Sequence, residues 1–215
     1  MQITSLSGFE SIIPELLDGT SNWAFGKSPS YTDANDILVE KLDYQGTELY
    51  LFDLHTRKVY QPFPKEPMMY LENPVYDPAS QSFGLLRYDF HRKIIQAYQY
   101  RPSEDELTLL TTLPFEKAGD LINVRLAISP FTLIKHEIHH FRTHILWPVE
   151  DVCQWETNEC LEYLDDQYFY TSKWVEEPEY VEEVIVRERN TKTIIRRQKG
   201  SITLLPNGEL WQFVS

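Results

Sequence analysis

The sequence predicts an all-β protein built from short antiparallel strands in repeated units. Aromatic residues make up 13% of the chain, and aromatic and β-branched residues are enriched in strands. The runs that contain them are short and end at Pro, Asn or Asp, which is typical of strands and turns. A pattern of one acid followed by His or Asn also recurs four times. A recurrence of this kind indicates a repeated structural unit.

The strand-like segments follow one another along most of the chain. In order, the expected strands are residues 49–52, 83–88, 94–100, 107–111, 184–186, 194–195, 202–205 and 210–213. The last two are separated by Pro-Asn-Gly-Glu, and Asn-Gly between two such runs is a strong hairpin signal. Only residues 8–18 predict a short helix, which Pro14 limits because proline disrupts a helix interior.

The repeated pattern places an acid four residues after an apolar residue, and His or Asn two residues after the acid. The four acids, about 45 residues apart on average, are Asp53, Asp89, Glu137 and Glu188. A carboxylate at a strand end can accept hydrogen bonds from backbone N–H groups of a turn, and His and Asn tolerate positive φ. We therefore expect hairpin turns in which His55, His91 and His139 bend the backbone. A functional role for these three histidines is the alternative.

Short strands that end in a proline turn precede two of the copies, at residues 75–78 and 127–130. The unit therefore contains four antiparallel strands in about 45 residues, close to the length of a propeller blade. In repeat length and hairpin pattern, residues 37–215 resemble the β-propeller superfamily of the TolB and WD-repeat kind. The resemblance implies a small propeller of four or five blades, in one domain over residues 1–215.

The N-terminal segment, residues 1–36, precedes the first unit and could complete the last blade, which would close the ring and remove sheet edges. The alternative fold for the same strands is a lipocalin-like closed β-barrel, which also removes its edges. A barrel does not require the 45-residue period.

The composition limits the class of partner. The chain has 215 residues, 42% of them hydrophobic and 25% charged, as in an ordinary soluble domain with its own core. It carries 20 Lys and Arg against 33 Asp and Glu, a net charge of −13. Phosphate backbones and anionic membrane surfaces attract the opposite sign. We therefore expect no nucleic-acid partner and no membrane partner.

Localisation is expected to be cytoplasmic. The first eight residues have neither a positive charge nor a long apolar run, so they do not predict a signal peptide. Uninterrupted apolar runs stay far below the ~18 residues that a membrane-spanning helix needs. Cys153 and Cys160 form neither a C-x-x-C motif nor a disulfide framework, and two such cysteines favour free thiols in a reducing compartment.

A histidine cluster at residues 136–144 offers one catalytic hypothesis. It contains H-E-x-x-H, from His136 to His140, which on a helix can bind zinc while Glu137 acts as general base. His144 would lie one turn further on the same face, and Glu159 and Glu162 are downstream carboxylates. A helix over residues 131–146, with or without metal, competes with the hairpin that the repeat predicts. The hairpin hypothesis leaves the chain with no catalytic residue, metal ligand or cofactor.

Residues 150–188 carry thirteen acids against two basic residues, and five basic residues follow over 189–199. One interpretation is a solvated face compensated by a neighbouring basic strand. The other is a docking surface for a basic protein partner, whose association such a field would accelerate.

The function hypothesis that fits best is a non-catalytic protein- or ligand-binding module. The chain has no G-x-S-x-G, Walker loop or G-x-G-x-x-G, so common hydrolase, nucleotide and dinucleotide signatures give no support for an enzyme. Aromatic residues such as Trp155, Phe169 and Tyr170 could line a ligand mouth or fill the blade core. The alternatives are a zinc-dependent hydrolase that uses His136, Glu137 and His140, and a small-ligand carrier with a barrel interior.

Overall fold

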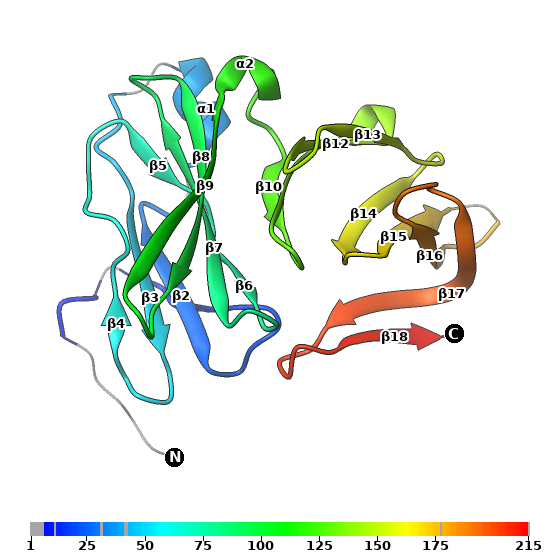
Figure 1. Ribbon diagram of the computed structural model, residues 1–215, viewed down its shortest axis with the longest axis horizontal. Coiled ribbons are helices and arrows are strands. Elements are labelled where there is room, and N and C mark those ends of the chain that lie inside the picture. The colour runs from blue at the N-terminus through cyan, green and yellow to red at the C-terminus, as the bar shows by residue number, and fades with distance from the viewer. Residues whose placement is uncertain (1–6, 11, 31, 41–42, 177, 215) are drawn as a thin grey trace.

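Four antiparallel sheets stand in a ring, which is the arrangement of a four-bladed β-propeller (Figure 1). The computed structural model describes residues 7–10, 12–30, 32–40, 43–176 and 178–214. The all-β prediction and the propeller architecture are confirmed. The barrel alternative is wrong, because the strands are divided among four separate sheets. The expectation of no signal peptide concerns residues that lie mostly outside the described ones.

Each sheet is one blade, named A to D in chain order. Blade A contains β1 (Glu15–Leu16), β2 (Trp23–Ser28), β3 (Glu48–Asp53) and β4 (Val59–Tyr60). Blade B contains β5 (Met69–Leu71), β6 (Val75–Asp77), β7 (Ser82–Asp89), β8 (Ile94–Arg101) and β9 (Glu106–Pro114). Blade C contains β10 (Val124–Ala127), β11 (Thr132–Glu137), β12 (Arg142–Trp147) and β13 (Asp151–Gln154). Blade D contains β14 (Glu159–Leu164), β15 (Tyr168–Val175), β16 (Val181–Glu188), β17 (Ile194–Leu204) and β18 (Leu210–Val214).

Helices are short and lie in the connections between strands. They are α1 (Ala34–Glu40), α2 (Phe115–Ala118) and the 3₁₀ turn η1 (Ile138–His140). The helix expected at residues 8–18 is replaced by β1, which pairs with β2. Within the described part of the chain, no helix combines the length and the apolar character needed to cross a membrane.

The N-terminal segment belongs to the first blade and does not complete the last one. β1 pairs with β2, and β2 pairs with β3, so the two strands of this segment form the inner half of blade A. The last blade, D, is built wholly from the C-terminal part of the chain. The ring is therefore assembled blade by blade in sequence order.

The four predicted hairpin turns are present, but positive φ falls on a residue other than the predicted one. It falls on the fourth residue after each acid, at Arg57, Lys93, Phe141 and Lys192. The histidines two residues after the acids are exposed at the turns and do not have positive φ. In three of the turns the acid accepts backbone hydrogen bonds as predicted; these acids are Asp53, Asp89 and Glu188. Asp53 Oδ1, for example, accepts from the N–H groups of His55 and Thr56, at 2.9 Å each.

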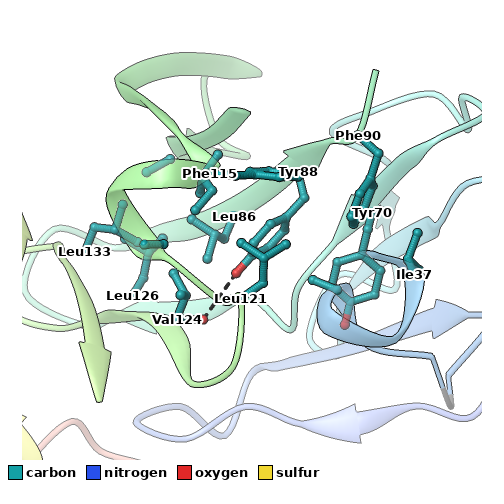
Figure 2. Close-up of a cluster of buried hydrophobic side chains, with 14 of the residues drawn as sticks. Ile37, Tyr70, Leu86, Tyr88, Phe90, Phe115, Leu121, Val124, Leu126 and Leu133 are labelled. Atoms are coloured by element: carbon teal, nitrogen blue, oxygen red, sulfur yellow. Dashed lines mark hydrogen bonds between the residues drawn. The ribbon is translucent and has the colours of Figure 1, made fainter. Parts of the chain in front are cut away.

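Apolar side chains fill the junctions between successive blades. Figure 2 shows the largest cluster, which includes Tyr70 and Tyr88 of blade B and Leu126 and Leu133 of blade C. The Tyr88 hydroxyl donates a hydrogen bond of 3.3 Å to the Val124 carbonyl, so the buried phenol is paired across the junction. Similar clusters join blade A to B and blade C to D. Burial of this kind contributes roughly 25 cal/mol per Å² of apolar surface.

Blades D and A meet through the C-terminal hairpin. Gly19, beside β1, has φ +76°, and a Cβ placed there would lie 2.9 Å from the Leu204 side chain. The same hairpin touches blade B, because a Cβ on Gly208 would lie 2.8 Å from Pro78. Both glycines therefore permit a close approach that a larger residue would block. The hairpin bridges the last blade and the first two.

Candidate binding site

The H-E-x-x-H segment forms a hairpin, so the helix alternative for residues 131–146 is wrong. β11 ends at Glu137, η1 makes one turn, and β12 returns along β11 with His136 opposite Thr143. Successive residues of a strand point to opposite faces. His136 therefore faces blade D, whereas Glu137 and His144 share the other face, where His144 Nε2 lies 3.3 Å from Glu137 Oε2.

The three zinc-ligand candidates do not converge. His140 is exposed in η1, and His136 and His144 are separated by the sheet. Among the described residues, no group of three or more His, Cys, Asp and Glu side chains is placed to hold a metal ion. Glu159, one of the downstream carboxylates, is fully buried and paired with Arg187. The geometry gives the zinc hypothesis no support.

His136 belongs instead to a neutral hydrogen-bonded group at the junction of blades C and D. Its Nδ1 lies 3.0 Å from Thr143 Oγ1, which also accepts a hydrogen bond of 2.7 Å from Trp155 Nε1. Its Nε2 lies 3.2 Å from Cys160 Sγ. Burial lowers the pKa of His136 and raises the pKa of Cys160 to about 11. A neutral thiol beside a neutral imidazole is a weak nucleophile. The contact between His136 and Cys160 instead links blade C to blade D.

Many acids of the segment 150–188 form ion pairs or accept hydrogen bonds within the protein. Glu150 pairs with Lys117, Asp151 with Lys192, and Glu156 with Lys173, Arg187 and Arg197. Asp165 accepts hydrogen bonds from the backbone and from the Tyr170 hydroxyl. These contacts match the compensated face that the sequence suggested. Glu177, one of the thirteen acids, lies outside the described residues.

One acid of this segment, Glu162, has a different position: it lines a cavity on the axis of the ring. This axial cavity has a volume of about 310 Å³ and receives residues from all four blades. Its polar lining is Glu15 and Asp18 of blade A, Asn73 and Tyr76 of blade B, Arg125 of blade C, and Glu162 and Tyr163 of blade D. The inner strands β1, β6, β10 and β14 place these side chains around the axis.

Two further cavities of about 420 Å³ each adjoin the axial cavity. Asn73 and Arg125 line both the axial cavity and the one at the start of the inner strands. Tyr163 and Leu204 are shared with the cavity at the other end, which the C-terminal hairpin borders. The three spaces therefore follow one another along the ring axis.

Negative charge prevails in the axial cavity. Three carboxylates face one guanidinium, and Arg125 already donates a hydrogen bond of 2.6 Å to the Leu161 carbonyl. The pKa of Tyr163 is raised, first by burial and then by Asp18 and Glu162, while the Leu204 N–H and Arg125 act in the opposite direction. Asp18 and Glu162 thus disfavour a further negative charge at this point. Ser172 Oγ holds Glu162 with a hydrogen bond of 2.5 Å, so this carboxylate is fixed in place.

The aromatic residues considered as a ligand mouth divide between the two predicted roles. Trp155 and Phe169 lie in the core between blades C and D. Tyr170 lines the cavity that adjoins the axial one. The sequence pattern does not single out Glu15, Asp18 and Arg125, because no local feature distinguishes the inner strand of a blade from its outer strands. The one signal was the pair of short strands at residues 75–78 and 127–130, which include β6 and the end of β10.

A scan against protein-family models found no match, and neither did a search of the curated proteins. The class of the chain therefore follows from its own architecture. It is a four-bladed propeller of antiparallel sheets with an acidic cavity on its axis.

Proposed function

We propose that this protein is a non-catalytic binding module that holds a lysine or arginine side chain of a basic protein partner in its axial cavity. The observation that carries the proposal is the set of three carboxylates, Glu15, Asp18 and Glu162, around one cavity against a single guanidinium. A volume of about 310 Å³ is at the lower end of small-molecule pockets, which suits one extended side chain.

The charge of the whole chain supports the same partner. A net charge of −13 attracts basic proteins over a distance and raises their association rate. Exposed acids of residues 150–188, such as Glu176 and Glu179, contribute to this long-range field, while the axial cavity supplies the contact. The blade length and hairpin pattern also support a place among propellers of the TolB and WD-repeat kind, in which blades surround a central channel.

The lining of the axial cavity favours binding over catalysis. Among the described residues that line it, there is no Ser, Thr, Cys, His or Lys, so a nucleophile with an adjacent base is not assembled there. The zinc-hydrolase alternative needs ligands that the hairpin separates. The carrier alternative needs a barrel interior, which four separate sheets do not form.

Titration calorimetry with an oligolysine peptide tests the proposal. We expect Glu162→Gln to weaken binding about tenfold, since a lost charge-assisted contact is worth on the order of 1.5 kcal/mol. Glu179→Gln is the matched control, because it removes the same charge from an exposed position away from the cavity. Binding should also weaken between low and high salt. Equal affinities of the two variants would contradict the proposal.

A further inference from the structure

The C-terminal hairpin leaves blade D at Gly200. Up to Lys199, β17 pairs with β16, and from Gly200 onward it pairs with β18. Gly200 has φ +129°, and a Cβ there would collide with the Phe213 carbonyl oxygen, so the change of partner requires glycine. Within the described residues β18 pairs with β17 alone, which leaves its other edge unpaired.

This unpaired edge lacks the features that usually protect one. Edge strands are commonly interrupted by Lys, Pro or a bulge, whereas β18 reads Leu-Trp-Gln-Phe-Val. Trp211, Phe213 and Val214 are 49%, 50% and 58% exposed. Residues 200–214 carry one charged side chain, Glu209, in a chain that is 25% charged. Two copies with a net charge of −13 repel each other elsewhere, so this uncharged strand is where they can approach.

We propose that β18 pairs antiparallel with β18 of a second copy, about a two-fold axis at Gln212. In this register Trp211 of each copy lies opposite Phe213 of the other, and Leu210 lies opposite Val214. Aromatic pairs directly across two strands stabilise a sheet. The strand is thus complementary to itself, as a two-fold interface requires.

Gln212 supplies an independent observation. Its side-chain Nε2 is buried and has no hydrogen-bond partner among the described residues. An unpaired buried donor is unfavourable. In the proposed register Gln212 lies directly opposite Gln212 of the second copy, with the Cα atoms about 5.5 Å apart or closer. In a single copy this amide is covered by its own chain, so on pairing each side chain turns toward the second copy and donates to the carbonyl oxygen of the other amide.

Light scattering over a concentration series, together with cysteine cross-linking, tests this interface. We expect a mass that rises from 25.4 kDa toward twice that value. Gln212→Cys should cross-link two copies under mild oxidation, because directly opposed strand residues are within disulfide distance. Thr203→Cys is the matched control: it is exposed on the same hairpin, but on the strand away from the free edge. Wild-type protein controls for Cys153 and Cys160.

A charge exchange tests the register. Trp211→Lys combined with Phe213→Lys places like charges opposite each other in both pairs and should weaken dimerisation at least tenfold. Trp211→Lys combined with Phe213→Glu places opposite charges there and should associate more tightly than the first double variant. A mass of 25.4 kDa at every concentration would overturn the proposal. A dimer that cross-links equally through residues 203 and 212, or through neither, would also overturn it.

Discussion

Glu159 and Arg187 form a two-pronged ion pair inside blade D. Arg187 Nε donates to Glu159 Oε1 at 2.8 Å, and Nη2 donates to Oε2 at 2.7 Å. Glu159 is 0% exposed and Arg187 8% exposed. The Thr171 hydroxyl donates a further hydrogen bond of 2.6 Å to the same carboxylate. The pair joins the innermost strand of the blade to its third strand, so it fixes the strand that carries Glu162.

Replacing Glu159 should therefore destabilise the fold. Glu159→Gln leaves the Arg187 charge buried without its main partner, and we expect a loss of about 3 kcal/mol in the free energy of unfolding. Glu150→Gln is the control, since its ion pair with Lys117 is exposed and should contribute less than about 1 kcal/mol. Urea unfolding measures both. Similar small losses in the two variants would contradict the importance given to the buried pair.

The buried histidine predicts a pH dependence of stability. Burial and then Arg125 lower the pKa of His136 below 6.5, against a weaker opposite effect of Glu162. The unfolded chain binds a proton as the pH falls through 6.5, whereas the folded chain binds it only at lower pH. Stability is therefore full above pH 6.5 and declines below it.

Substitution of His136 should flatten this decline. We expect the difference in unfolding free energy between pH 7.5 and pH 5.5 to be smaller in His136→Asn than in the wild type. His139→Asn, at an exposed position of the same hairpin, should keep the wild-type difference. An unchanged pH dependence in His136→Asn would show that another group is responsible.

Both cysteines should resist alkylation in the folded protein. They are free thiols, and burial raises the pKa of Cys153 and of Cys160 to about 11. Since the thiolate is the reactive form, iodoacetamide at pH 8 should label them far more slowly in native protein than in urea. Mass spectrometry follows the labelling. Rapid native labelling of Cys160 would contradict the neutral pair with His136.

The position of positive φ in a hairpin turn predicts that glycine substitutions at two positions of the same turn change the unfolding free energy in opposite directions. Arg57 has φ +62°, a conformation that is unfavourable for residues with a Cβ. Arg57→Gly should therefore raise the unfolding free energy, by about 0.5 kcal/mol. His55→Gly should lower it by a similar amount, because its φ is negative and glycine adds freedom to the unfolded chain. Thermal unfolding distinguishes the two variants.

The architecture could be predicted from the sequence because its signals are local. Each hairpin needs an acid at the end of a strand and a short turn, and these recur at blade-length intervals. The residue with positive φ is Arg57 and not the predicted His55, so residue type alone does not indicate this position. The αL position is set by the number of turn residues, and the lysine, arginine or phenylalanine there carries no propensity signal.

The axial cavity could be predicted only in part. The sequence includes Glu162 among the thirteen acids of residues 150–188. Nothing in the neighbouring residues distinguishes it from Glu159, which is fully buried in an ion pair. Strand alternation and a bulge near Leu161 decide which acid faces the axis. Glu15, Asp18 and Arg125 come together with Glu162 only when the four blades close into a ring.

An NMR titration with the oligolysine peptide tests the central claim most directly. We predict that the amide signals of Asp18, Val75, Leu126 and Tyr163, one from each blade, shift together along one binding curve, and that Glu162→Gln reduces all four shifts. Shifts confined to the exposed acids Glu176 and Glu179, with those four signals unchanged, would contradict the account.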